Sequence, residues 1–351
     1  MKDTPVDDDR YLWDRTGEPD PETARLEALL APLRHRGVPP VLPARQVVDG
    51  RLTRWKLPAL AAAAMIVLCA GAAWLLYPDR HSGWSVEGVS GTPLVVDRTS
   101  GGTRTRGAGV SVGEIARLGI GSALTTDGGS RARLAVGRIG SVEVDPNTHV
   151  LIEPAAVGQH RMSLQSGTIH ARISAPPYIF FVNTPSAVAV DLGCEYTLQV
   201  DESGAGLIRV TLGWVAFEHD GRQSFIPAGA VGATRPGSGP GTPRYEDAPS
   251  GYGDALAVLD FSAAADLRRA AALDLILSTA RRRDALTLWH LLRDGTPEDR
   301  ARVYARLAAL APPPSGVTQE AILRGEPAAL NQWWDSIGIG NRSWWRLWKK
   351  K

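Results

Sequence analysis

Residues 184–200, TPSAVAVDLGCEYTLQV, decide the fold more than any other stretch of the chain. In the second half of this stretch, Tyr196, Leu198 and Val200 alternate with more polar residues. An alternation of period two is typical of a β-strand with one buried face. Because Asp191 and Gly193 interrupt the apolar run before it, the stretch predicts a strand, a turn and a second strand.

The same alternation appears on both sides of this stretch, with turn-forming residues between the runs. The apolar members of three further runs are Ala132, Leu134 and Val136; Ile169, Ala171 and Ile173; and Ile208, Val210 and Leu212. The turn signals are Asp127-Gly128, Asp145-Pro146-Asn147, Ser166-Gly167, Ser203-Gly204 and Asp220-Gly221, the last of which predicts a tight hairpin. Many short strands at this spacing predict a sandwich, a barrel or a β-solenoid over residues 84–235.

From Leu118 to Val231 the segments LTTDGGSRARLAV, GSVEVDPNTHV, MSLQSGTIHARI and FFVNTPSAVAVDLGCEYTLQV follow in an order that resembles the FecR domain. This family contains membrane-anchored regulators of extracytoplasmic-function sigma factors. The resemblance implies a mainly β domain of short antiparallel, solenoid-like strands. The residues that carry it most specifically are Thr184, Pro185, Asp191, Leu192, Gly193, Cys194 and Tyr196. The family usually has Thr at position 194 and often Phe at position 196, so we interpret both changes as packing variants in a structural motif.

Residues 57–77, LPALAAAAMIVLCAGAAWLLY, contain no charged side chain. As a helix this run would be about 31 Å long, enough to cross a hydrocarbon core of about 30 Å. A buried core helix is the alternative, but it would have to be apolar on every face. Six basic residues precede the run between positions 34 and 56, and only Arg80 follows it closely. The positive-inside rule therefore predicts one transmembrane helix in the inner membrane, with the N-terminus cytoplasmic and the β domain periplasmic.

The predicted cytoplasmic head, residues 1–36, carries an apolar stripe on a short helix. Asp20-Pro21-Glu22 is typical of a helix start. So short a segment cannot easily bury the stripe internally, so it needs a protein partner, a dimer mate or the membrane surface. The alternative is a helix lying against the membrane or a partly disordered tail. The predicted partner-binding residues are Trp13, Leu26, Leu29, Leu30 and Leu33, the leucines at helical spacing. Residues 37–56 are predicted to be a basic linker.

The C-terminal third is predicted to be helical after a linker at residues 236–253, where Gly, Pro and Ser are frequent. Helical patterns then cover residues 254–338, with Asp284 and Thr296 as predicted caps. Trp333 and Trp334 belong to the last helix, where aromatic residues more often form the core than a partner site. The tail, residues 339–351, interleaves tryptophans with Arg and Lys, which suits a membrane surface, an acidic partner or packing on the helical module.

Charge and motifs favour a regulator over an enzyme. The formal net charge of +2 does not suggest direct binding to nucleic acid, and the sequence contains no HExxH or CxxC motif. We therefore expect no catalytic residues, no metal and no cofactor. The leading hypothesis is a single-pass regulator that transmits an envelope signal to a cytoplasmic sigma factor, with an envelope protein or ligand on the β domain. The alternative is a membrane-anchored envelope scaffold or ligand-binding module without a sigma partner.

Overall fold

The computed structural model describes residues 21–33, 83–98 and 105–338. The chain divides into two compact units, Met1–Ala70 and Gly71–Lys351, and each is described by itself. The predicted membrane span at residues 57–77 lies outside the described residues, as do Trp13 and the tail at residues 339–351. Within the described ranges, no helix has the length and apolar character needed to cross a membrane.

The described part of the first unit is the helix α2 (Pro21–Leu30), followed by the 3-10 turn η1 (Ala31–Leu33). Pro21 occupies the first helical position, and Glu22 lies in the first turn, beside the positive end of the helix dipole. The regular helix ends just before Pro32, whose ring clashes with a preceding helical turn. No side chain of α2 is buried. The described residues of this unit therefore do not cover the apolar side chains of α2.

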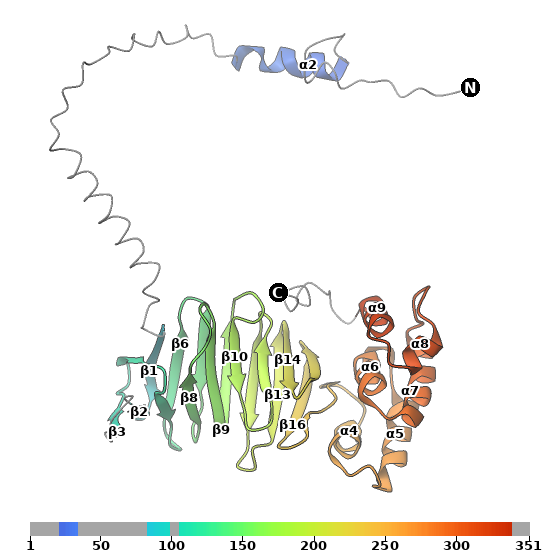
Figure 1. The fold of residues 1–351 in the computed structure, drawn as a ribbon. Coiled ribbons are helices and arrows are strands. Elements are labelled where there is room, and N and C mark those ends of the chain that lie inside the picture. Colours follow the sequence, from blue (N-terminus) through green and yellow to red (C-terminus); the bar gives the residue numbers. More distant parts are fainter. Residues whose placement is uncertain (1–20, 34–82, 99–104, 339–351) are drawn as a thin grey trace, which may run out of the picture. The chain divides into compact units, whose positions relative to one another are not determined.

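The second unit contains a sandwich of two β-sheets, drawn from cyan to yellow in Figure 1. Sheet A consists, in spatial order, of β4 (Ile115–Leu118), β1 (Trp84–Ser90), β6 (Arg131–Val136), β7 (Gly140–Val144), β9 (His160–Ile173), β12 (Glu195–Val200), β13 (Gly206–Leu212) and β16 (Ala230–Arg235). Sheet B consists of β3 (Thr105–Gly109), β2 (Leu94–Arg98), β5 (Ala123–Thr125), β8 (His149–Glu153), the first half of β9, β10 (Phe180–Asn183), β11 (Val188–Asp191), β14 (Trp214–His219) and β15 (Arg222–Pro227). Neighbours are antiparallel except β9 and β10, which confirms the predicted mainly antiparallel domain.

Strand β9 belongs to both sheets and bends between them at Ser166 and Gly167. Its first half pairs with β8 in sheet B, and its second half pairs with β7 and β12 in sheet A. Gly167 has φ +97, and a Cβ atom there would lie 2.3 Å from Oγ1 of Thr148, so glycine is required. The sequence predicted a turn at Ser166-Gly167, whereas the structure has a bend within one continuous strand.

The core lies between the two sheets and contains the apolar residues of the predicted alternation. Leu134, Ile169 and Leu198 are fully buried there. Leu212 is an exception, because its side chain is 60% exposed although the alternation predicted it to be buried. The cause is a β-bulge: Glu195 pairs with Leu212 but Tyr196 pairs with Val210, so Thr211 is an extra residue. An extra residue reverses the alternation, which turns Leu212 to the outer face.

The turns of the sandwich gather at two ends, which we call proximal and distal. The proximal end is the one at which the chain enters β1, and hydrogen bonds join its turns. The nitrogen of Gly137 donates to the Gly83 carbonyl at 2.7 Å, and that of Ser174 donates to Ile139 at 2.7 Å. At the distal end, the nitrogen of Thr126 donates to the carbonyl of Thr148 at 3.0 Å. Both ends of β9 lie at the proximal end because the strand bends at the distal end.

The helical module follows the sandwich and packs against its β14–β16 end (Figure 1), where it contacts β14 and the edge strand β15 of sheet B. Its elements are α4 (Tyr252–Phe261), α5 (Arg268–Thr279), η2 (Arg282–Asp284), α6 (Ala285–Asp294), α7 (Pro297–Leu310), α8 (Gln319–Leu323) and α9 (Pro327–Ile337). Trp334 of α9 contacts both Trp214 and Phe225, with ring centroids 6.1 and 6.0 Å apart. His290 of α6 is buried, and burial lowers its pKa to about 3. Its Nε2 therefore accepts a hydrogen bond from the Phe225 nitrogen at 3.0 Å.

The segment at residues 236–253 differs from the predicted linker because most of it is packed. It contains the short strands β17 (Gly239–Pro240) and β18 (Arg244–Tyr245), which both pair with β16. Pro240, Thr242 and Tyr245 are buried. The Oγ1 atom of Thr287 in α6 donates to the Pro243 carbonyl at 2.8 Å. The segment therefore fixes the helical module to the sandwich.

The helix caps agree with the sequence in one case and differ in the other. Thr296 accepts a hydrogen bond from the nitrogen of Asp299 at 3.2 Å, as a capping residue of α7. Asp284 makes no side-chain cap on α6. Its carboxylate is buried and accepts instead from the backbone and guanidinium nitrogens of Arg281, at 2.8 and 2.9 Å. Asp284 therefore stabilises the turn before the helix.

We expect Trp333→Ala to unfold the helical module selectively. The indole is fully buried, and its N–H donates to the carbonyl of Ala311 at 3.0 Å. Truncation of a buried tryptophan typically costs about 3–5 kcal/mol. Hydrogen–deuterium exchange of the full chain in detergent should therefore show greatly reduced protection in α7. Leu267→Ala is the control because Leu267 is 95% exposed. Equal protection in both variants would contradict the buried placement.

Candidate functional site

The predicted partner-binding leucines lie on one exposed face of α2. Leu26, Leu29 and Leu30 are 59%, 67% and 58% exposed, within an arc of about 100°. Leu33 closes η1, and Trp13 lies outside the described residues. Exposed leucines in a row are a surface that a protein partner can bury. The structure thus brings three of the five predicted residues together.

The FecR-like motif residues do not form one site, because β11 separates them into two groups. Thr184 and Pro185 precede β11 at the distal end, whereas Asp191 ends β11 at the proximal end and Gly193 and Cys194 follow it. Thr184 closes its own turn: its Oγ1 donates to the Ala187 carbonyl at 2.8 Å and accepts from the Ala187 nitrogen at 3.0 Å. The distal group therefore has a structural role.

The proximal group is built around the carboxylate of Asp191, which is only 2% exposed. Its Oδ1 accepts from the Gly193 nitrogen at 2.7 Å, and its Oδ2 accepts from the Cys194 thiol at 2.8 Å. Burial raises the pKa of Asp191 to about 7, although both hydrogen bonds oppose the rise. Burial and the neighbouring carboxylate also raise the pKa of Cys194, so this thiol is a poor nucleophile.

Two further residues of the motif pack in the core beside Asp191. Leu192 is buried, and its nitrogen donates to the Trp214 carbonyl at 3.2 Å. The ring of Tyr196 is also buried, and its hydroxyl has no hydrogen-bond partner among the described residues. An unpaired buried hydroxyl destabilises a fold, so the ring, rather than the hydroxyl, is what this position needs. This agrees with the phenylalanine that the family often has there.

A groove of about 540 Å³ lies beside the motif at the proximal end. Arg138 and Ile139 line it from the β6–β7 turn, Gly193 and Cys194 from the motif, and Leu212 from β13. The outward turn of Leu212 at the β-bulge contributes to the apolar part of the lining. No local sequence pattern indicates this groove, because its walls come from turns that are distant along the chain.

A polar cluster on the outer face of sheet A contains an acid, a histidine and a hydroxyl. His170 contacts Asp145 Oδ2 through Nε2 at 2.9 Å and Thr197 Oγ1 through Nδ1 at 2.8 Å. A hydrolase would also need paired donors for an oxyanion. Thr197 lies in β12, whose backbone donors are used by β9 on one side and β13 on the other. We therefore interpret the cluster as cross-strand pairing on a solvated face.

Residues 109–113 read GVSVG and match the GxSxG pattern of serine hydrolases. In those enzymes the serine sits on a turn from a strand to a helix. Here Ser111 lies in an exposed turn between β3 and β4, and its nitrogen donates to Glu114 Oε2 at 2.9 Å. The match therefore lacks the structural context of a nucleophile.

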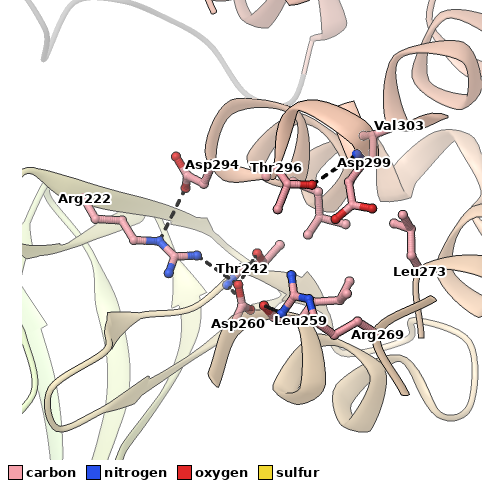
Figure 2. A pocket seen from close by; sticks show the side chains of 12 residues that line it. Arg222, Thr242, Leu259, Asp260, Arg269, Leu273, Asp294, Thr296, Asp299 and Val303 are labelled. Atoms are coloured by element: carbon pink, nitrogen blue, oxygen red, sulfur yellow. Dashed lines mark hydrogen bonds and ion pairs between the residues drawn. The ribbon is translucent and has the colours of Figure 1, made fainter. Parts of the chain in front are cut away.

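A cavity of about 100 Å³ lies between the sandwich and the helical module. Figure 2 shows the buried Asp260 of α4, which accepts from the Thr242 nitrogen at 2.7 Å and from Arg222 of β15 at 2.9 Å. Burial raises the pKa of Asp260, and the contacts with Thr242 and Arg222 oppose this. Ligand sites typically have volumes of about 300–1,000 Å³. The cavity is therefore a polar joint between the two parts.

Comparison with known proteins agrees with the predicted resemblance. The family model described as FecR protein matches residues 122–216, which confirms the FecR domain. Two solved structures, both described as a "putative anti-sigma factor from Parabacteroides distasonis ATCC 8503", share 14% identity with this chain at a TM-score of 0.32. The match covers 38% of this chain and 63% and 62% of those chains, so it spans less than two thirds of either. No curated protein sequence matches this chain.

We expect Asp191 to destabilise the fold progressively as pH rises from about 4 to about 7. Over this range the unfolded chain releases the Asp191 proton while the folded chain keeps it, because the folded pKa is about 7 and the unfolded value is 3.8. Each pKa unit corresponds to about 1.4 kcal/mol. Asp191→Asn has no proton to release, so this loss of stability is absent from the variant. The free energy of unfolding of the variant, relative to that of the wild type, should therefore rise by a few kcal/mol between pH 4 and 8. Chemical denaturation at each pH measures it.

Two variants of Cys194 test the same carboxylate from the donor side. Cys194→Thr supplies a stronger hydroxyl donor and should lower the pKa of Asp191, which narrows the pH range of the effect. Cys194→Val removes the donor at similar volume and should widen it. The effect of Asp191→Asn on the free energy of unfolding is measured against pH in the wild type, in Cys194→Thr and in Cys194→Val. If this effect is independent of pH in all three, Asp191 is not protonated in the folded protein.

Proposed function

We propose, because residues 122–216 match the FecR family, that this chain is a single-pass inner-membrane regulator of a sigma factor. The observation that carries the proposal is the exposed leucine face of α2, joined in one chain to a FecR domain. The run at residues 57–77 supports a membrane span between the two. In this arrangement α2 holds the factor in the cytoplasm, and a signal reaching the periplasmic β domain alters that hold.

Each part of the chain has a distinct role in this mechanism. Leu26, Leu29 and Leu30 enter an apolar groove on the sigma factor, as in other helix-in-groove contacts. The acidic residues before α2 steer the encounter with a basic DNA-binding surface. The β domain receives an envelope protein or ligand. Residues 339–351, with their tryptophans and basic residues, supply a further contact with a membrane or an acidic partner.

We expect Leu29→Asp/Leu30→Asp to abolish binding of extracytoplasmic-function sigma factors from the source organism. Burying one leucine contributes about 1.5–3 kcal/mol, so losing two lowers affinity at least about 100-fold. The full chain in nanodiscs would be titrated with each factor by calorimetry. The matched control is Ala24→Asp/Ala28→Asp, which adds the same charge to the opposite, exposed face of α2. Equal affinity in the leucine variant and the wild type would refute docking through this face.

Neutralising Asp7, Asp8 and Asp9 to Asn should affect kinetics more than affinity. Exposed charges mainly accelerate association, and salt screens them. Stopped-flow association rates at low and high salt should therefore converge in the triple variant. A chain that binds no sigma factor at all would favour the envelope scaffold or ligand-binding module.

The topology predicts the activity of alkaline phosphatase fusions, since this enzyme folds only outside the cytoplasm. A fusion after Arg80 should be active, and a fusion before Leu57 should be inactive. The motivation is the uncharged run at residues 57–77 with basic residues before it. The reverse pattern of activities would show that the N-terminus lies outside.

A further inference from the structure

The turns at the two ends of the sandwich differ sharply in charge. At the proximal end, the described turns between successive strands from β4 to β16 contain Arg138 and no Asp or Glu. These turns are residues 119–122, 137–139, 154–159, 174–179, 192–194, 213 and 228–229. The distal turns contain no Lys or Arg, and their acidic residues are Glu114, Asp127, Asp145, Asp201, Glu202 and Asp220. Because successive strands return to the same two ends, every second turn along the chain lies at the same end, and the charges of these alternate turns are brought together there.

Most acidic residues at the margins of the proximal end are buried or lie beside an arginine. Glu195 pairs with Arg172 at 2.7 Å, and Arg172 lines the proximal groove. Glu153 lies opposite Arg161 across the β8–β9 ladder. Asp191 is buried behind the motif.

Glu246 and Asp247, beside the turn at residues 228–229, pair with Arg209 and with Arg281 and Arg283. Asp97 is exposed and accepts a hydrogen bond from the Ser122 hydroxyl. Asp97 is thus the one acidic residue at this end, among the described residues, for which neither burial nor a neighbouring arginine offsets the charge.

Exposed apolar side chains mark three of the proximal turns or their margins. Val157 is 92% exposed, Leu212 is 60% exposed, and Ile120 is 57% exposed. They come from the β8–β9 turn, the bulged end of β13 and the β4–β5 turn. Apolar side chains beside arginine are the composition that interfacial membrane contacts use.

The chain length between the predicted span and the sandwich limits how far this end lies from a bilayer. Six residues separate Tyr77 from Trp84, and Trp84 begins β1 at the proximal end. A fully extended chain covers about 3.3–3.6 Å per residue, which gives about 20 Å. This step rests on the membrane topology of the proposed function.

We propose that the proximal end of the sandwich rests on an anionic lipid surface. Val157, Leu212 and Ile120 enter the interfacial region, and Arg138 meets lipid phosphates at the mouth of the proximal groove. The acidic distal turns point away from the same negative surface, so repulsion favours this orientation over the inverted one. The competing orientation is edge-on, with the exposed Ile115 of edge strand β4 against the lipid.

Fluorescence quenching by lipid measures this orientation in the full chain. Val157→Cys, Leu212→Cys, Ser203→Cys and Ile115→Cys are labelled singly in a Cys69→Ser background, with the buried Cys194 kept. The chains are placed in nanodiscs of phosphatidylcholine and phosphatidylglycerol that contain a lipid with a nitroxide headgroup. Ser203 is the control because it lies in an exposed distal turn, about 20 Å away along strands of six residues.

We expect severalfold stronger quenching at positions 157 and 212 than at 203 or 115. Replacing phosphatidylglycerol by phosphatidylcholine, or introducing Arg138→Glu, should reduce the quenching at 212. Strongest quenching at 115 would establish the edge-on orientation and overturn the proposal. A chain that ends at Gly338 should show the same quenching at positions 157 and 212. If the quenching disappears in this shortened chain, the membrane contact belongs to residues 339–351 instead.

Protease protection of residues 57–77 in the same nanodiscs separates this inference from the proposed topology. If these residues are protected and quenching is equal at 157 and 203, the lipid contact fails while the topology stands. If they are digested, the topology fails, and the proposed lipid contact fails with it.

Discussion

The bend of β9 at Gly167 is the constraint on which the rest of the sandwich depends. One strand supplies a member to each sheet, and no side chain larger than hydrogen fits where Gly167 meets Thr148. Because β9 starts and finishes at the proximal end, the flanking strands of both sheets have their turns at the same two ends. The bend thereby helps to place the motif and the groove beside it at the proximal end.

Period-two alternation predicts buried positions such as Leu134 and Leu198, because it needs only local sequence. The Asp220-Gly221 hairpin is predicted for the same reason, and its residues adopt φ 45 and φ 80, as such a turn requires. The bend at Gly167 and the bulge at Thr211 depend on the partner strand, so local patterns place them wrongly. The register of each strand against its neighbour determines the bend and the bulge, and local sequence patterns do not reveal that register.

The candidate sites likewise differ in whether local sequence predicts them. The leucine face of α2 follows from helical spacing alone, and resemblance supplies the motif around Asp191. The raised pKa of Asp191 follows from burial by several strands and has no local signal. The packing of the helical module does have a local sequence signal. WVAF in β14 and FIP in β15 are continuous apolar runs, as expected of strands covered on both faces. The composition of residues 236–253 predicted a linker, but contacts with β16 and α6 bury several of these residues.

The proposed lipid contact decides which surfaces of the sandwich remain for an envelope signal. The helical module covers sheet B around Phe225, and in the proposed arrangement the proximal end faces the membrane. The distal end and the outer face of sheet A are left. Polar groups predominate on both. The distal turns carry six acidic residues, although Val112 is 64% exposed among them, and sheet A carries cross-strand pairs such as Arg133 with Glu143 at 3.1 Å. A partner binding there must match charge rather than bury apolar area.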